Sequence, residues 1–143
     1  MSTKYSKYIV TRCENPDHGH DWSPVYKPQD RTRILRLDEE VMEGAKLYAS
    51  AVWFWPSMMK TDISERSSKP HVHDHDEVLG IIGTNPDDPH DLCGESEITL
   101  GGEKHIVDKS ALIYIPAGLE HGPFREHRID RPILHFEFRI LRY

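Results

Sequence analysis

The stretch ESEITLGGEKHIVDKSALIYIPAGLEH, residues 95–121, decides the fold of this chain. It holds short β-rich runs separated by turn signals, a pattern typical of antiparallel strands. The turn LGGEKH, residues 100–105, predicts a hairpin, because Gly101 and Gly102 tolerate positive φ angles. The run ALIYI, residues 111–115, indicates a further strand that ends at a proline. The stretch therefore predicts strands that fold back on one another.

Outside this stretch the chain keeps the same character. Runs of β-branched and aromatic residues recur between segments rich in Pro, Asp, Ser and Gly. One segment, Asp38–Ala45, has the 3.6-residue apolar period of one or two helical turns. Many short strands in 143 residues favour an all-β sandwich or small barrel. The strands that we expect are 8–11, 33–37, 46–55, 71–75, 78–83, 97–100, 105–107, 111–115 and 132–141.

The composition excludes several classes of protein. A length of 143 residues suits one compact domain, because two separate cores would each be small. A net charge of −6 with scattered basic residues argues against nucleic-acid binding. The longest apolar runs, AVWFWP and ALIYIP, are far shorter than the ~20 residues that cross a bilayer. The N-terminus also lacks a signal-peptide pattern, so we expect a cytoplasmic protein that binds neither membrane nor nucleic acid.

The beginning of the chain differs from the rest. Its segment CENPDHGHDWSPVYKPQD holds three prolines and little periodicity. We assign residues 1–45 to an irregular N-terminal arm and packing segment, and residues 46–143 to the β-barrel. A second irregular stretch, TNPDDPHDLCG at residues 84–94, predicts a projecting loop between strands.

The cysteines do not define a site. Cys13 and Cys93 are too few for a disulfide-stapled scaffold. Cys13 lies near His18 and His20, but this group lacks the matching partner of a zinc site. We interpret it as part of an exposed arm.

The segment HVHDHDE carries the chemistry. Residues two apart on a strand point to the same face, so His71 and His73 can reach one ion. A turn at the Asp-His-Asp that follows would bring Glu77 back toward the same point on the next strand. His121, in PAGLEH, is the candidate for a fourth ligand. Histidine and carboxylate donors suit a divalent ion such as Fe, Mn, Co, Ni or Zn.

A second register would replace His71 by His75. It leaves a single residue between His75 and Glu77, which is too few for a turn, so we favour the first register. His75 is otherwise a turn residue or a donor that orients a ligand. Asp74 and Asp76 are expected to stay at the surface, where they add negative potential.

These residues resemble the two sequence motifs of the cupin superfamily. The first motif, HxHxxxE, is matched by His71, His73 and Glu77, and the second, PxGxxH, by Pro116, Gly118 and His121. The resemblance covers residues 47–141. It implies a small jelly-roll barrel of two antiparallel sheets, which holds one divalent metal per chain through the three histidines and the glutamate.

Two strands leave the direction of their faces open. The apolar face of RPILHFEFRIL consists of Leu134, Phe136, Phe138 and Ile140. We favour this face as core, which turns His135, Glu137 and Arg139 toward solvent or a partner. The alternative is that the apolar face packs against a second subunit and that His135 and Glu137 point into the barrel near the site. In the earlier strand, either Trp53 or Phe54 lines the cavity and the other packs outside.

Four protein ligands on a six-coordinate ion leave two positions open, as a catalytic site requires. We expect a metal-dependent enzyme that acts on a small chelating organic substrate, with a dioxygenase and Fe favoured. Mn, Ni, Co or Zn would instead support an isomerase, lyase or decarboxylase, and a small-molecule-binding protein without turnover is a further alternative. The resemblance also implies that Glu77 can serve as a base.

The chain is expected to form a homodimer. A small jelly roll exposes sheet edges and an outer face, and the strand ILHFEFRIL has more aromatic surface than one core face needs.

Overall fold

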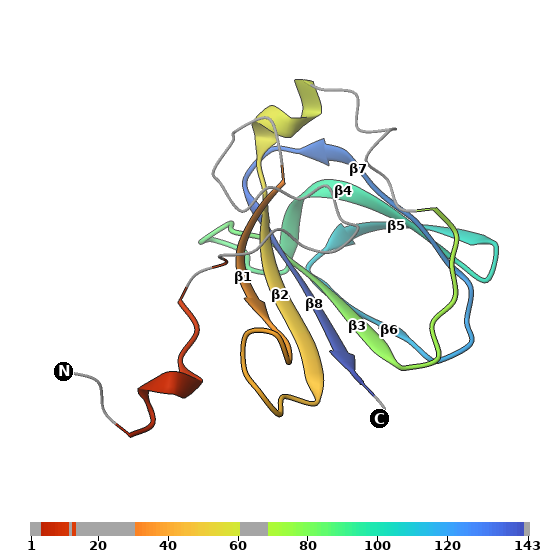
Figure 1. Cartoon of the computed structure of the whole chain (residues 1–143). Coiled ribbons are helices and arrows are strands. Elements are labelled where there is room, and N and C mark those ends of the chain that lie inside the picture. Colours follow the sequence, from red (N-terminus) through yellow and green to blue (C-terminus); the bar gives the residue numbers. More distant parts are fainter. Residues whose placement is uncertain (1–3, 12, 14–30, 61–68, 142–143) are drawn as a thin grey trace.

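The computed structural model describes residues 4–11, 13, 31–60 and 69–141, and in these it holds eight strands and two short 3₁₀ helices (Figure 1). The strands are β1 (Thr32–Leu37), β2 (Leu47–Phe54), β3 (Glu77–Ile82), β4 (Asp91–Leu100), β5 (Glu103–Lys109), β6 (Ala111–Ile115), β7 (His121–Ile129) and β8 (Ile133–Ile140). The 3₁₀ helices are η1 (Ser6–Tyr8) and η2 (Pro56–Lys60).

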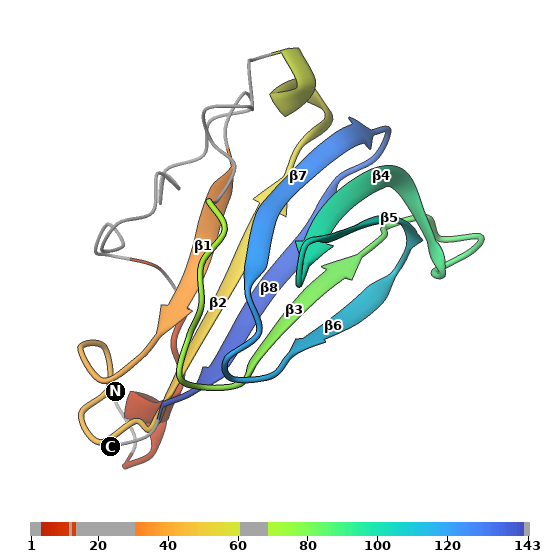
Figure 2. The ribbon, with the colours of Figure 1, turned by 90° about the vertical axis from the view of Figure 1, so that its right-hand side faces the viewer.

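The strands form two antiparallel sheets that pack face to face (Figure 2). The larger sheet has the order β1-β2-β8-β3-β6, and the smaller has the order β5-β4-β7. The hairpin between β4 and β5 turns at Gly101 and Gly102, whose φ angles are 55° and 82°. This arrangement confirms the prediction of an all-β jelly roll of two antiparallel sheets.

Most predicted strands are confirmed, and the differences have local causes. β7 was not predicted, because Arg125, His127 and Arg128 interrupt its apolar pattern on the outer face of the smaller sheet. β4 begins at Asp91, so the loop that was predicted for residues 84–94 is shorter. Residues 8–11 and 71–75 are not strands, although His71 makes an isolated bridge.

The predicted helical segment is wrong as a helix. Residues 38–45 form turns, with one helix-like bond from the Met42 amide to the Asp38 carbonyl at 2.8 Å. The Asp38 carboxylate also accepts a bond from the Glu40 amide, which closes the turn locally. β1 pairs with β2 along its length, so the larger sheet begins at Thr32. The interpretation of Cys13, His18 and His20 as part of an exposed arm is not tested, because His18 and His20 lie outside the described residues.

The favoured orientation of β8 is wrong. His135 and Glu137 are 2% and 6% exposed and face the barrel interior, and Arg139 lies on the same face. The side chains of Leu134, Phe136, Phe138 and Ile140 lie on the outside of the larger sheet, as the alternative described. In β2 the inward residue is Phe54, which is fully buried, while Trp53 lies on the outer face.

The barrel interior has two tiers along the strands. The apolar tier is built mainly from Val52, Phe54, Ile81, Ile98, Phe124 and Ile133. Burying each such side chain contributes roughly 1.5–3 kcal/mol, so this tier supplies most of the packing energy. The polar tier, at the other end of the same strands, consists of Tyr48, Ser50, Glu77, Glu137 and Arg139. The strands that hold the core therefore also deliver charged side chains to one end of the barrel.

No helix among the described residues is long and apolar enough to span a membrane.

Candidate metal centre

The two motif segments meet at the end of the barrel that carries the polar tier. The His71 amide donates to the His121 carbonyl at 2.9 Å, and the His121 amide donates back to His71 at 3.0 Å. The chain then bends at residues 74–75 and enters β3 at Glu77. The turn that was expected after His73 is present, and it returns Glu77 to the histidines.

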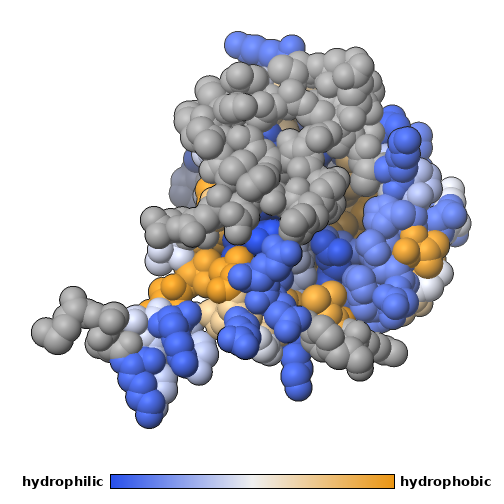
Figure 3. Space-filling model, in the orientation of Figure 1, coloured by the Kyte–Doolittle hydropathy of each residue, from blue (hydrophilic) through white to orange (hydrophobic). Residues whose placement is uncertain are grey.

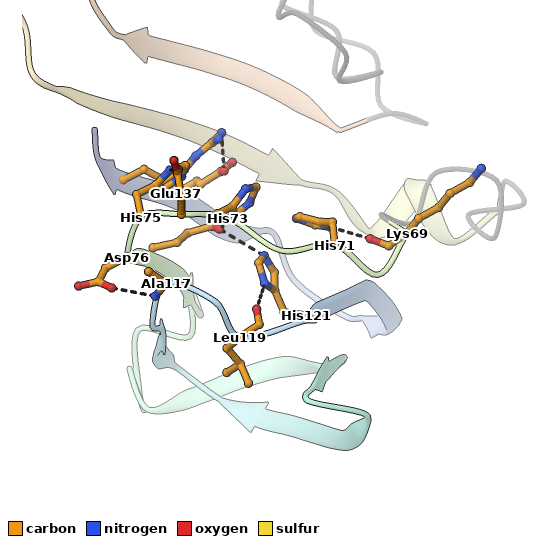
Figure 4. Close-up of polar contacts among 12 residues, drawn as sticks. Lys69, His71, His73, His75, Asp76, Ala117, Leu119, His121 and Glu137 are labelled. Atoms are coloured by element: carbon orange, nitrogen blue, oxygen red, sulfur yellow. Dashed lines mark hydrogen bonds and ion pairs between the residues drawn. The ribbon is translucent and has the colours of Figure 1, made fainter. Parts of the chain in front are cut away.

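Three histidines converge on one point, as Figure 4 shows. The ligand nitrogens of His71, His73 and His121 all lie within 4.8 Å of one another. The Glu77 Oε2 atom is 3.2 Å from His73 Nε2 and 3.4 Å from His121 Nε2. The structure thus brings together all four residues of the first register. Among the described residues, the metal-binding group does not include His75.

Backbone carbonyls set the tautomers of two of these histidines. His71 Nδ1 is 2.6 Å from the Lys69 carbonyl, and His121 Nδ1 is 2.9 Å from the Leu119 carbonyl. A carbonyl only accepts, so each Nδ1 carries the proton and each Nε2 keeps its lone pair for an ion.

The donor set fits a divalent transition metal. His121 Nε2 and Glu77 Oε2 are buried and have no hydrogen-bond partner among the described residues. Leaving such atoms unsatisfied costs free energy, and an ion bound between them removes that cost. Neutral imidazole nitrogens and one carboxylate are ligands that Fe, Mn, Co, Ni and Zn accept.

The electrostatics of the group favour a neutral His73 and an ionised Glu77. Burial lowers the pKa of His73 to about 4, against the opposite effect of Glu77. Burial alone would raise the pKa of Glu77, but the neighbouring side chains of His121 and Glu137 and the charge of Arg139 bring it to about 2. Burial works against protonation of His121, yet its contact with Glu77 raises its pKa overall. Deprotonated ligands are what metal binding requires.

Asp76 fixes the two motif turns to each other. Its carboxylate accepts bonds from the Tyr114 hydroxyl at 2.5 Å and from the Ala117 amide at 2.9 Å. The Gly118 amide donates to the His73 carbonyl at 2.9 Å, and its φ angle of 87° suits glycine. Asp76 is therefore a structural residue of the site, whereas Asp74 is exposed, as expected.

His75 packs against the centre from one side. Its ring stacks on His73 with centroids 4.8 Å apart and planes at 14°. Its Nδ1 atom lies 3.2 Å from an Asp74 carboxylate oxygen. The stacking restricts the orientation of the His73 ring.

Glu137 and Arg139 also lie beside the candidate centre. The favoured orientation of β8 had turned both toward solvent or a partner. Arg139 lies opposite Glu77 across the β3–β8 pair, and its guanidinium is 2.7 Å from Glu137. Burial raises the pKa of Glu137 to about 8, against the effect of Arg139 and with a further upward effect of the Glu77 charge. The alternation of polar and apolar residues in β8 predicts that Glu137 and Arg139 share one face of the strand. It does not predict whether that face points into the barrel or outward.

Comparison with known proteins supports the fold. No protein-family model matches the sequence, and no curated protein is significantly similar to it. Among solved structures, a predicted oxalate decarboxylase from Thermotoga maritima aligns with a TM-score of 0.51 and 15% identity, over 79% of this chain and 80% of that one. A conserved protein of unknown function from Streptococcus pyogenes aligns with a TM-score of 0.51 and 14% identity, over 93% and 96%.

An RmlC-like cupin from Shewanella frigidimarina aligns over 92% of this chain and 96% of that one, with a TM-score of 0.47 and 16% identity. At these identities the likeness concerns the fold alone. The features that this fold brings together here are two antiparallel sheets, a bridge between both motif segments and three convergent histidines. This chain therefore has the fold of these solved structures, a jelly roll of two antiparallel sheets.

Proposed function

We propose that the chain is a metal-dependent enzyme that acts on a small chelating organic substrate, with dioxygenase chemistry on Fe favoured. The observation that carries the proposal is the convergence of His71, His73 and His121, together with Glu77, on one point. These four residues would hold the ion, which would supply O₂ activation as Fe or Lewis-acid chemistry as Zn, Mn or Ni.

The chain leaves access to the centre. The His73 side chain is 23% exposed and His71 is half-buried, whereas His121 and Glu77 are buried. Four protein ligands leave two positions of a six-coordinate ion for other groups. A substrate with two adjacent oxygen donors fits such a pair of positions, which favours diols, hydroxy acids and enolisable ketones.

A non-redox reaction is the second candidate, and the buried Glu137, on the strand that pairs with β3 at Glu77, favours it. Burial raises the pKa of Glu137 to about 8, so this carboxyl keeps its proton at neutral pH next to the ionised Glu77. A proton held at this position can serve an isomerase, lyase or decarboxylase, with Glu77 as the base.

A substrate panel run with and without O₂ separates the candidates. The protein is loaded in turn with Fe, Mn, Co, Ni and Zn and incubated in air and under argon with diols, hydroxy acids and diketones. We expect turnover with Fe that consumes O₂ and stops under argon. An oxygen electrode measures the O₂ consumption, and mass spectrometry detects the product. Equal turnover under argon would reject the dioxygenase in favour of the non-redox reaction. Thermal shifts with no product would indicate a binding protein.

We also propose a homodimer through the outer face of the larger sheet. A groove of about 580 Å³ lies on this face, lined by apolar residues that include Leu35, Ala51, Leu112, Phe136 and Phe138. Apolar side chains gather where the N-terminal segment meets β1 and β2 (Figure 3). Leu112 is 68% exposed, which is costly for an apolar residue that has no partner.

Light scattering tests the dimer. We expect a mass of twice the 16.6 kDa of one chain, and we expect Leu112→Lys to shift it toward the monomer by placing a charge in the interface. Ile106→Lys is the matched control, because Ile106 is also exposed but lies on the smaller sheet. A wild-type mass near that of one chain at micromolar concentration would exclude the dimer.

A further inference from the structure

The polar tier extends beyond the four proposed ligands. Tyr48 and Glu77 both lie opposite Arg139 across their strand pairs, and Ser50 lies opposite Glu137. All of these side chains share the inner face of the larger sheet. A barrel interior at this depth is ordinarily apolar, so a cluster of this kind needs a physical explanation.

Arg139 is held rigidly within the tier. One guanidinium nitrogen is 2.7 Å from the Glu137 carboxylate, and the guanidinium carbon lies 4.3 Å from the centre of the Tyr48 ring. The two contacts fix the guanidinium plane, which is the arrangement that recognises a carboxylate through paired N–H donors.

Two further polar atoms of the tier have no hydrogen-bond partner among the described residues. These atoms, Arg139 Nε and Ser50 Oγ, are both buried. Ser50 is 5% exposed, so bulk water does not satisfy its hydroxyl. Two buried donors on neighbouring strands, of which Arg139 lies opposite the proposed ligand Glu77, are the elements of a subsite for an oxygen-rich group.

The charges of the tier select the sign of that group. Arg139 and one divalent ion would bring three positive charges, whereas Glu77 and Glu137 together supply at most two negative charges. At least one positive charge then has no counter-charge inside the barrel. A substrate with a single carboxylate would balance it, whereas a neutral substrate would leave a buried excess charge.

We infer that Arg139, with Ser50 beside it, binds the carboxylate of the substrate, so that the substrate is a small monocarboxylic acid that also chelates the metal. The inference rests on the proposed function, because it places this carboxylate next to the proposed metal centre. It assigns Arg139 to substrate binding and leaves the ligand set unchanged.

Binding to the cobalt-loaded protein tests the inference without turnover. The visible absorption of Co²⁺ first reports whether one ion binds per chain, and its change on titration then reports binding of lactate or of its neutral analogue lactamide. We expect wild type to bind lactate more tightly than lactamide. Arg139→Gln should weaken lactate binding about 10- to 100-fold through loss of a charge-assisted contact and leave lactamide within about twofold.

Control variants separate this role from others. Arg128→Gln removes one positive charge from an exposed position of β7 and should change neither affinity. Because Arg139→Gln leaves Glu137 without its partner, the double variant Glu137→Gln with Arg139→Gln is measured as well, and it should show the same selective loss.

The outcomes distinguish failure of the proposed metal-dependent function from failure of the carboxylate subsite. Absence of stoichiometric Co²⁺ binding in wild type would overturn the proposed function itself. Normal Co²⁺ binding with no preference of wild type for lactate, or an equal loss of both ligands in the variants, would overturn the carboxylate subsite alone.

Discussion

Replacing His121 by Ala is expected to lower the affinity for a divalent transition metal by about 100-fold or more. The substitution removes the buried Nε2 atom that faces Glu77, and two half-exposed histidines with one carboxylate remain. The fold should survive, because the bridge between residues 71 and 121 uses backbone atoms that alanine retains. Competition against a chromophoric chelator measures the affinity, and elemental analysis of protein purified without an affinity tag measures the metal content.

His105→Ala is the matched control for this experiment. His105 lies on β5, in the smaller sheet, with a side chain that is 48% exposed. The His105→Ala variant should bind the metal with the same affinity as wild type. Unchanged metal content in His121→Ala, with normal circular dichroism, would mean that the second motif does not supply a ligand.

The second large effect concerns stability in acid and depends on His135. Its ring is fully enclosed between Phe54 and Phe124, with centroids 5.0 and 5.3 Å away, and its Nδ1 donates to the Gly80 carbonyl at 2.8 Å. Burial lowers the pKa of His135 from 6.5 to about 4. The unfolded chain therefore binds a proton at a higher pH than the folded chain does.

The sign of the pH dependence follows from this difference. The stabilisation by neutral His135 is complete above pH 6.5 and is lost as the pH falls toward 4. The loss amounts to about 3 kcal/mol at the acid end, since each pKa unit is worth about 1.4 kcal/mol. His135→Gln keeps a donor for Gly80 but does not titrate, so it should not show this loss.

Urea unfolding at pH 7.5 and pH 4.5 measures the effect as a difference between wild type and His135→Gln. Groups that titrate in both proteins cancel in this comparison. We expect the free energy of unfolding of wild type to fall by about 2 kcal/mol more than that of the variant. His105→Gln, at an exposed position, should follow wild type. Parallel behaviour of wild type and His135→Gln would contradict the role of the buried ring.

The candidate ligand set could be predicted from the sequence because most of its geometry is local. The spacing of His71 and His73 is set by the strand repeat, and the return of Glu77 is set by the turn that follows. Motif resemblance supplied His121, and the backbone bridge to His71 explains why the two segments lie side by side. The hairpin at Gly101 and Gly102 was predicted for the same local reason.

The side chains that surround the candidate site, Glu137 and Arg139 among them, could not be predicted from local sequence patterns. The alternation in β8 determines that Glu137 and Arg139 share a face, but a period of two is identical for either direction. Polarity favoured the wrong direction, because charged side chains are rarely buried unless they are paired. Their pairing with each other and the contact of Arg139 with Tyr48 bring together residues from different strands.

By itself, therefore, the sequence determined the all-β character, the hairpin and the convergence of His71, His73 and Glu77, since each depends on neighbours within a few residues. Only the tertiary structure decided that β7 is a strand, that Phe136 faces outward and that Arg139 lies opposite Glu77 on the inner face. The physical reason is that the free energy of burying a face depends on what packs against it. That partner comes from distant parts of the chain, or from a second copy of it.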